Sequence, residues 1–389
     1  MTKLGTSADV QSDQRIIQNI VLPDEGTLGP EENYIRSEHG VYDAFCGGLK
    51  FHAGSIINTL TYYNAFSQSR WKESTNVRSI SLTVHGSGTF KVEAYLANAE
   101  GLSSDLPELD EPVRNGSVVD DLLCSNIVTL SDSGAISLPE IDLDSLEEGL
   151  IFFKFHAIEN TVIKSATIRC AQAPIRPVKL GLVITHFNRQ QEVSAAVAKI
   201  RSNLVDHEQL AGMIELFVVD NSSNSGIADS PGITVINSKN LGGSGGFSRG
   251  LLELVRDGSF THCLFMDDDA SCEPESVRRT VAIFAHSNSD KTAVAGSLIH
   301  EADHATVYEC GAYFDGLCHR INSDLDVRLP FHLLVADREV FRPNYGGWWF
   351  FGFSIKSCNY FPFPFFVRGD DVSFSMITKL DVVKINGIA

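Results

Sequence analysis

The chain has 389 residues, of which 43% are hydrophobic and 21% charged, so it is a folded globular protein long enough for two domains. Its formal net charge of −18 argues against nucleic-acid binding, which requires a basic surface. The eight cysteines form no CxxC pair and show no metal-ligand spacing, which favours free thiols in a reducing cytoplasm over a disulfide framework.

Targeting and membrane signals are not evident in the sequence. Residues 1–18 are polar and carry charges of both signs, which is not the pattern of a signal peptide. No run of 18 apolar residues occurs, so we expect no segment that spans a bilayer.

The first half of the chain has the pattern of a β-rich domain. We expect a polar arm over residues 1 to about 35. SISLTV at 79–84 alternates in polarity, as does TFKVEAYLA at 89–97, and Gly86-Ser87-Gly88 between them predicts a hairpin turn. Residues 100–121 are acidic and contain two prolines, so we interpret them as a loop.

Further strand-like segments follow at short intervals: SNIVTL, AISLPEIDL, LIFFKFHAI and VIKSATIRC. Many short strands with hardly a helical period predict an all-β, jelly-roll-like sandwich, which we assign to residues 1–173. The proline-marked segment at 173–177, APIRP, is interpreted as the domain boundary.

Residues 178–389 alternate between strand and helix patterns instead. Continuous apolar runs predict buried strands at 180–185, 216–220, 233–236 and 263–267. One helix is marked by apolar residues at spacings of four, three and four: Val193, Val197, Ile200 and Leu204. A second helix begins at Pro274, with Val277, Val281 and Phe284 as its apolar stripe. This alternation predicts an α/β domain with a mostly parallel, Rossmann-like sheet.

The stretch at 239–270, KNLGGSGGFSRGLLELVRDGSFTHCLFMDDDA, carries the strongest functional signal. Four glycines predict a turn that brings backbone N–H groups close to an anion at a helix start: Gly242, Gly243, Gly245 and Gly246. We expect Leu251, Leu252 and Val255 to form the buried face of that helix.

Three aspartates, Asp267, Asp268 and Asp269, end the strand that follows. Open α/β sheets bind ligands at the carboxyl ends of their strands, and carboxylate oxygens suit Mg²⁺ or Mn²⁺ holding a diphosphate. A solvated acidic turn is the competing interpretation of three aspartates alone. The glycine turn upstream favours a nucleotide-type site.

Polar residues follow two earlier strands at the same edge: Thr185, His186, Asn188 and Arg189, and then Asp220, Asn221, Ser222 and Ser223. An aspartate at the second strand end commonly accepts hydrogen bonds from a ribose or base, and Arg189 is suited to a phosphate or base. Asp-Asn-Ser-Ser is also a common structural turn. The glycine run is not a Walker A motif, because no Gly-Lys-Ser/Thr follows it.

These motifs occur in the order Thr-His-Phe-Asn-Arg, Val-Val-Asp-Asn, Asn-Leu-Gly-Gly-Ser-Gly-Gly-Phe-Ser-Arg and Met-Asp-Asp-Asp. In this order they resemble the GT-A core of family 2 inverting glycosyltransferases, and within them the bacterial galactofuranosyltransferases. The N-terminal half is similar to the β-sandwich of that family through Thr61-Tyr62-Tyr63-Asn64-x-Phe66 and Trp71.

The resemblance implies a donor site. Asp267 and Asp269 would ligate Mn²⁺ or Mg²⁺, which takes up charge on the diphosphate as UDP leaves. Nucleotide-sugar contacts are implied for five residues: Arg189, Asp220, Gly242, Gly243 and Asp268.

The resemblance also implies an acceptor site. Asp371 matches the catalytic base, which takes the proton from the acceptor hydroxyl in a single displacement. Asp370, Trp348 and Trp349 match acceptor-binding positions, where a flat ring covers the apolar face of a sugar. Without the resemblance, core packing is the better interpretation of the tryptophans, and a helix N-cap of the aspartate pair.

Two departures from the family pattern stand out. Gly369 lies where the family usually has a tryptophan before its Asp-Asp pair, which leaves acceptor specificity open. The family places a metal-binding histidine about where this chain ends, at Ala389, so we expect a longer parent protein whose GT-A domain continues. Three other histidines come before Asp371 in the sequence, whereas the family's metal-binding histidine comes after the base, so they do not match its position: His300, His304 and His319.

We therefore expect an enzyme that moves galactofuranose from UDP-galactofuranose to a glycan acceptor, which we expect to be lipid-linked, in cell-surface polysaccharide synthesis. Its expected location is the cytoplasm, and contact with the inner face of the cell membrane and self-association are compatible with this role. The alternatives are transfer from another nucleotide sugar such as dTDP-rhamnose, and an inactive carbohydrate-binding protein.

Overall fold

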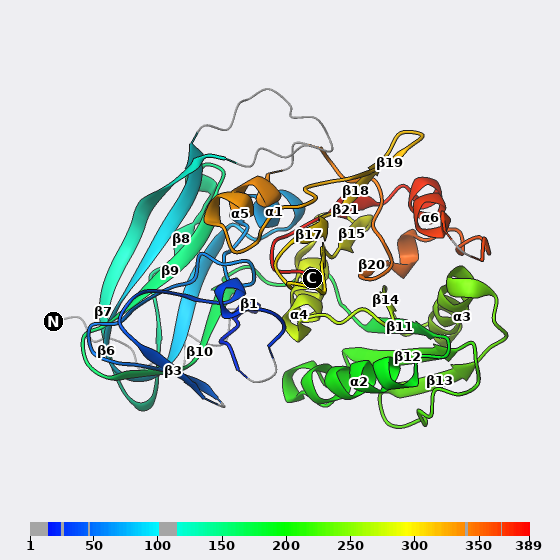
Figure 1. Cartoon of the computed structure of the whole chain (residues 1–389), viewed down its shortest axis with the longest axis horizontal. Coiled ribbons are helices and arrows are strands. Elements are labelled where there is room, and N and C mark those ends of the chain that lie inside the picture. Colours follow the sequence, from blue (N-terminus) through cyan, green and yellow to red (C-terminus); the bar gives the residue numbers. More distant parts are fainter. Residues whose placement is uncertain (1–14, 25–26, 46, 101–114, 339–340, 367) are drawn as a thin grey trace.

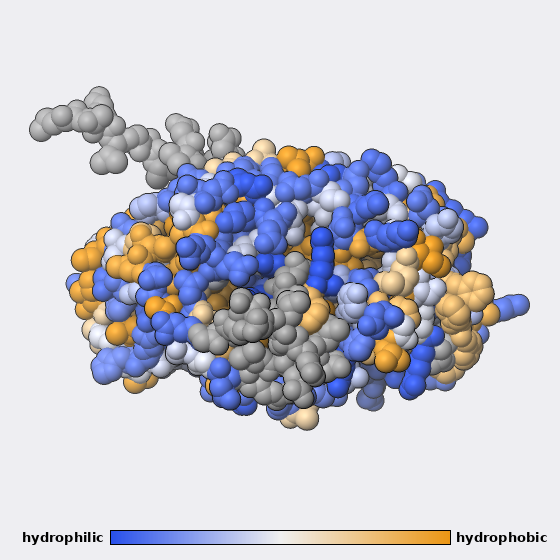
Figure 2. All heavy atoms as spheres, turned by 90° about the horizontal axis from the view of Figure 1, so that it is seen from above, coloured by the Kyte–Doolittle hydropathy of each residue, from blue (hydrophilic) through white to orange (hydrophobic). Residues whose placement is uncertain are grey.

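The computed structural model describes residues 15–24, 27–45, 47–100, 115–338, 341–366 and 368–389. The strands of the first half gather on one side of the molecule and the α/β half lies on the other, with α4 and α5 between them (Figure 1). On the face seen in Figure 2, apolar surface occurs at both ends of the molecule, over the strands of the first half and at the end that carries α3 and α6. Within the described ranges, no helix is long and apolar enough to cross a membrane.

In the described part of the first half, ten strands form one antiparallel sheet. They are β1 (Arg15–Ile20), β2 (Arg36–His39), β3 (Tyr42–Phe45), β4 (Gly48–Phe51), β5 (Ile56–Asn58), β6 (Ser79–Glu100), β7 (Ser117–Ser137), β8 (Ile141–Asp142), β9 (Leu150–Ala157) and β10 (Thr161–Cys170). The helix α1 (Gln68–Ser74) and two short 3-10 helices, η1 (Glu31–Asn33) and η2 (Leu143–Ser145), accompany them. The predicted sandwich would consist of two separate sheets. In the structure, hydrogen bonds through β6 join the strands of the first half into one sheet.

The predicted hairpin at Gly86–Gly88 is wrong, because β6 runs without a turn from Ser79 to Glu100. Its first part pairs with β10 and its second part with β9, and the register with β7 shifts between Gly86 and Gly88. A Cβ on Gly86 would lie 2.0 Å from the carbonyl oxygen of Val162 on β10. These glycines therefore serve a bulge and a close approach of strands, not a turn.

Two other expectations for the first half, the polar arm and the acidic loop, need correction. The arm includes a strand, β1, and residues 117–121 belong to β7; residues 101–114 of the predicted loop lie outside the described residues. The aromatic stretch at 60–71 is buried throughout, because its side chains pack between the sheet and the second half of the chain. The predicted boundary at 173–177 is irregular backbone hydrogen-bonded to α4, and the division into two domains stays a prediction.

The second half forms a seven-stranded sheet with flanking helices, within the described residues. Its elements are β11 (Leu180–His186), α2 (Gln190–Ile200), β12 (Ile214–Asp220), β13 (Ile233–Asn237), α3 (Gly242–Asp257), β14 (His262–Asp267), α4 (Pro274–His286), β15 (Thr292–Ala295), β20 (Phe351–Ser354), α6 (Asp370–Thr378) and β21 (Asp381–Val383). Outside this sheet lie β16 (Leu298–Ile299), β17 (Val307–Glu309), β18 (Ala312–Phe314), β19 (Cys318–Arg320) and α5 (Pro330–Asp337), with the short turns η3 (Arg201–Val205), η4 (Glu208–Leu210) and η5 (Ile355–Ser357).

The strand order of this sheet is β13-β12-β11-β14-β20-β15-β21. The first four strands are parallel to one another, as the buried apolar runs predict. β20 runs antiparallel to both of its neighbours, whereas β21 is parallel to β15. The sheet is thus mixed, and its parallel block places the carboxyl ends of β11, β12 and β14 at one edge.

The helix α3 begins at Gly242, so the glycine run forms its first turns rather than a separate loop. Of the predicted buried face, Leu251 is buried, whereas Val255 is 44% exposed; Phe247 and Leu254 complete the face. Small residues on this face let the helix lie directly on β11: a Cβ on Gly246 would stand 2.3 Å from Thr185, and one on Gly250 equally close to Val183.

The two halves of the chain are joined by a fully buried arginine of α4. Arg279 donates to the backbone carbonyls of Asn19, Tyr63 and Gly387 and forms an ion pair with Glu275 at 3.2 Å. Glu275 in turn accepts hydrogen bonds from the backbone and side-chain N–H groups of Asn19. One charge pair thus fixes β1, the aromatic stretch and the last residues of the chain.

Arg279→Met is expected to lower the free energy of unfolding by about 3–5 kcal/mol, because it leaves a buried carboxylate and three carbonyls without their donor. Urea denaturation measures this loss. Arg256→Met on the exposed face of α3, 62% exposed, is the matched control and should change stability by less than about 0.5 kcal/mol. Equal effects of the two substitutions would contradict the role given to Arg279.

Gly246→Ala is expected to cost about 1–3 kcal/mol, because its Cβ has no room against Thr185. Gly243 lies one turn earlier in the same helix, and nothing stands within 4 Å of a Cβ built there. Gly243→Ala should therefore be neutral or stabilise the fold by up to about 1 kcal/mol. Thermal unfolding of the two variants distinguishes close packing from a general intolerance of alanine, in which case both would lose stability.

Candidate active site

The polar residues that follow three parallel strands meet at one edge of the sheet. In the strand register, His186 of β11 stands opposite Asp220 of β12, and Thr185 stands opposite Asp267 of β14. The sequence predicted this meeting from strand ends alone. All three strands are buried, and at this edge Thr185 and Asp267 are partly exposed whereas His186 and Asp220 remain buried.

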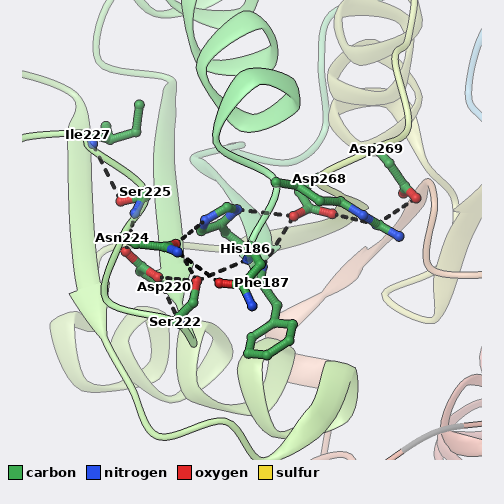
Figure 3. A network of polar contacts seen from close by, with 11 residues as sticks. His186, Phe187, Asp220, Ser222, Asn224, Ser225, Ile227, Asp268 and Asp269 are labelled. Atoms are coloured by element: carbon green, nitrogen blue, oxygen red, sulfur yellow. Dashed lines mark hydrogen bonds and ion pairs between the residues drawn. The ribbon is translucent and has the colours of Figure 1, made fainter.

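Asp268 is the centre of the network at this edge (Figure 3). It is 5% exposed and accepts hydrogen bonds from Arg189 at 2.9 Å and from the backbone N–H of Phe187 at 3.3 Å. Its other contact is with Nδ1 of His186 at 3.2 Å, while Nε2 of that ring lies 3.1 Å from Asn224. Asp268 thus holds the segment after β11 in place.

Arg189 also forms an ion pair with Asp269 at 2.6 Å, so one guanidinium bridges two of the three aspartates. The hydrogen bond to Asp268 and the charge of Asp269 raise the pKa of Arg189 above its ordinary value, against the effect of burial. Arg189 and Asp269 are both about half exposed, so this pair, unlike Asp268, is open to a ligand.

Asp220 closes a turn. Its carboxylate accepts hydrogen bonds from the backbone N–H groups of Ser222 and Ser225 at 2.9 and 2.7 Å, and from the Ser222 hydroxyl. Burial raises the pKa of Asp220, but the hydrogen bonds outweigh it and leave the pKa below its usual value. These contacts of the Asp220 carboxylate are those of a structural turn. The side chain of Asp220 is only 2% exposed.

The start of α3 faces the same edge. Asn221, next to Asp220, donates to the carbonyl of Gly242 at 3.4 Å. Gly242 has a φ of +76° and lies against the backbone of Phe366, which only a glycine permits. Gly243 borders open space, so its backbone is accessible to a ligand at the helix N-terminus.

Asp267 carries uncompensated negative charge. Burial and the charges of Asp269 and Asp268 raise its pKa to about 7, and only Arg189 acts in the other direction. A divalent cation is the group that relieves such crowding of carboxylates, and oxygen ligands suit Mg²⁺ and Mn²⁺. Among the described residues, however, no group of three or more His, Cys, Asp or Glu side chains is arranged to enclose a metal ion.

Asp267 and Asp269 line a cavity of about 410 Å³. Its walls come from both halves of the chain and include Tyr63, Trp349 and the chain's final residue, Ala389. His300 and His304, which do not match the family's histidine position in the sequence, line the same cavity. His319 instead contacts Asp315 at 3.2 Å.

The second acidic pair lies at the start of α6. The charge of Asp370 contributes to the raised pKa of Asp267, so these residues, about 100 positions apart in sequence, lie near each other. Burial raises the pKa of Asp371, whose carboxylate accepts the N–H of Val372 at 2.8 Å. Both acidic clusters therefore belong to one region of the molecule.

The two adjacent tryptophans have different surroundings. Trp348 is 5% exposed and packs edge-on against Phe247, Phe265 and Phe374, so the structure places it in the core, not on the cavity wall. Trp349 lines the cavity, and its Nε1 donates to the carbonyl of Gly296 at 3.0 Å. Only the second ring of the predicted pair reaches the site.

Sequence reasoning missed Glu309 and Tyr345 beside Asp371. Burial, followed by the charge of Asp371, raises the pKa of Glu309 to about 8, whereas Arg320 opposes this shift. Glu309 Oε1 is buried without a hydrogen-bond partner among the described residues, and the charges of Glu309 and Asp371 also raise the pKa of Tyr345. A lone glutamate at the end of a short strand gives no sequence signal of such a role.

Comparisons with known proteins agree with this geometry. Residues 41–171 match the family Galactofuranosyltransferase 2 N-terminal, and residues 182–308 match Glycosyl transferase family 2. Galactofuranosyltransferase GlfT2 of Mycolicibacterium smegmatis (strain ATCC 700084 / mc(2)155) is 25% identical over 84% of this chain and 52% of its own length. Its namesake from Mycobacterium tuberculosis (strain ATCC 25618 / H37Rv) is 25% identical over 60% of this chain and 36% of its own.

The chain thus spans about half the length of the first of these relatives and less of the second. Among solved structures, the mannosyltransferase PcManGT from Pyrobaculum calidifontis, in complex with GDP-Man and Mn²⁺, is similar with a TM-score of 0.38 and 11% identity, over 56% of this chain and 57% of its own. The two matched families cover the two halves in the predicted order. The sequence similarity thus assigns residues 182–308 to a glycosyltransferase family 2 match and residues 41–171 to a match of the galactofuranosyltransferase 2 N-terminal type.

Proposed function

We propose that this chain transfers galactofuranose from UDP-galactofuranose to a glycan acceptor, with a divalent metal and with inversion at the anomeric carbon. The observation that supports this most is that Asp267 and Asp269 line one cavity while the charge of Asp370, next to Asp371 at the start of α6, acts on Asp267. A transferase needs both groups together: one to hold the leaving diphosphate and one to activate the acceptor. The donor sugar is carried over from the two relatives, which bear the name galactofuranosyltransferase.

For the donor, we assign Asp267 and Asp269 as the metal-holding carboxylates. When bound, Mn²⁺ or Mg²⁺ takes up the charge that develops on the diphosphate oxygens. Arg189, which is paired with Asp269 in the free protein, is placed to contact a phosphate. The open backbone of Gly243, next to Gly242, presents N–H groups of a helix start to the same anion.

For the uridine part, the carboxylates at the strand ends are assigned supporting roles. Asp220 shapes the turn that borders the site, and Asp268 orients Arg189 and His186. Both carboxylates are already engaged by the protein, so we assign them positioning roles. Direct contact with the nucleotide falls to Arg189 and the glycines.

For the acceptor, we assign Asp371 as the general base. Burial raises its pKa, which makes its carboxylate a stronger base than that of an exposed aspartate. Asp370 and Trp349 are placed to hold the acceptor sugar, with the indole ring covering its apolar face. Trp348 supports this wall from the core.

The segment before α6 is proposed to contact a membrane surface. Four phenylalanines there are between 47% and 60% exposed: Phe361, Phe363, Phe365 and Phe366. Aromatic rings are favoured at membrane–water interfaces, and Arg368 follows them in sequence. Such contact would bring Asp371 close to an acceptor anchored in lipid, at the inner face of the cell membrane.

Asp269→Ala is expected to remove the metal-dependent part of UDP binding. Calorimetric titration of UDP with and without Mn²⁺ should show at least about tenfold tighter binding with metal for the wild type and no gain for the variant. Asp206→Ala, which removes an exposed carboxylate next to η3, should keep the full gain. A metal effect that survives Asp269→Ala would refute the assignment of Asp269.

Asp371→Asn is expected to lower the transfer rate by about 10²–10⁴-fold while UDP binding is retained. The wild-type rate should rise with pH as Asp371 loses its proton, with the acid limb above the ordinary range of an aspartate because burial raises this pKa. Product formation from UDP-galactofuranose, compared with dTDP-rhamnose, is the readout. Full activity of the variant would exclude Asp371 as the base.

Phe363→Ser combined with Phe365→Ser is expected to weaken sedimentation with vesicles of anionic lipid by at least about tenfold, since each exposed ring contributes up to about 1.5–3 kcal/mol when it leaves water. The control is Ile127→Ser on β7, which removes a side chain that is 71% exposed on the other half of the chain. Unchanged vesicle binding in the double variant would rule out this membrane contact.

A further inference from the structure

A second cavity, of about 330 Å³, lies on the other side of the segment that follows β14. It opens between α2 and the start of α4, and its walls are mainly apolar: Ala195, Ala196, Ile200, Leu204, Met266 and Pro274. Its volume falls at the lower end of the range for small-molecule sites, which are also mostly apolar with few polar groups. None of the roles assigned above uses this cavity.

One cation stands in this apolar surrounding. Lys199 of α2 lines the cavity, and its Nζ atom is buried without a hydrogen-bond partner among the described residues. Its charge lowers the pKa values of Cys272 and Glu273, against the larger effect of burial, so the ammonium lies near both. A buried ammonium is costly unless an anion contacts it, and no described carboxylate lies within ion-pair distance.

The acidic residues nearby do not supply that contact. Glu273 is engaged by the Tyr34 hydroxyl at 3.3 Å, and Asp268 and Asp269 are engaged by Arg189. Glu192 also borders the cavity but is exposed, where water screens its charge. Among the described residues that line this cavity, Lys199 is therefore the one with a buried polar atom that lacks a partner.

We propose that this cavity binds a small amphipathic carboxylate, whose carboxylate pairs with Lys199 and whose apolar chain fills the space between α2 and α4. A chain of about eight carbons matches a cavity of this size. The apolar walls account for the chain and the lysine for the head group. Binding at this site is independent of the transferase activity proposed above.

The site has a consequence for the neighbouring one. Asp269 and the segment Ala270, Ser271 and Cys272 border both cavities, so an occupant touches the back of the wall that carries the metal carboxylates. Occupancy is expected to change the affinity for UDP and Mn²⁺, and by linkage these ligands change the affinity for the carboxylate by the same factor. This consequence rests on the proposed function, whereas carboxylate binding does not.

Octanoate is the probe, with 1-octanol as its uncharged counterpart, titrated calorimetrically without metal or nucleotide. Lys199→Met should weaken octanoate binding at least about tenfold and leave 1-octanol binding unchanged, because only the head-group contact is lost. Ala196→Phe should abolish binding of both by filling the cavity. Lys164→Met, which removes an exposed lysine of β10, is the charge-matched control and should bind octanoate as the wild type does.

The melting temperature of Lys199→Met should equal or exceed that of the wild type, because a buried charge without a partner is removed. Failure of octanoate to bind, equal binding in the wild type and Lys199→Met, or binding that survives Ala196→Phe would each overturn the proposal. A clear loss of melting temperature in Lys199→Met would also overturn it, since Lys199 would then serve an internal ion pair.

Discussion

The site depends on a crowding of negative charge at one sheet edge. Asp267, Asp268 and Asp269 follow a buried strand, Asp370 approaches from α6, and one guanidinium, that of Arg189, is paired with two of them. Because the edge is partly shielded from water, this repulsion is not fully screened, and the pKa of Asp267 rises to about 7. Such crowding favours the binding of a cation, on which the proposed donor site depends.

Much of this edge could be predicted from the sequence because local rules govern it. Buried parallel strands appear as continuous apolar runs, and the residue after each run must lie at the carboxyl edge. The positions of Thr185, Asp220 and Asp267 in the strand register are therefore as predicted. The nearness of Asp370 to this edge was inferred from the family resemblance and not from any local pattern.

The predictions that failed depend on tertiary contacts. The glycines at 86 and 88 form a pattern that is typical of a turn, yet here they allow neighbouring strands to approach closely. A single sequence does not distinguish a turn glycine from a glycine at a close contact between strands. Trp348 and Trp349 are adjacent and identical, but one packs in the core and the other lines the cavity, which only the path of the chain into β20 decides. The unpartnered oxygen of Glu309 and the buried ammonium of Lys199 arise from tertiary contacts, which leave no trace in local patterns.

The central claim is that the two acidic clusters share one metal-binding cleft, and metal-directed cleavage tests it most directly. Fe²⁺ bound in place of Mn²⁺, with UDP present, generates radicals on addition of ascorbate and peroxide that cut only nearby backbone. Fragment mapping should show cuts both near residues 267–269 and near residues 369–371, and both should disappear in Asp269→Ala. Cuts confined to the first segment would place the second cluster elsewhere and contradict the account.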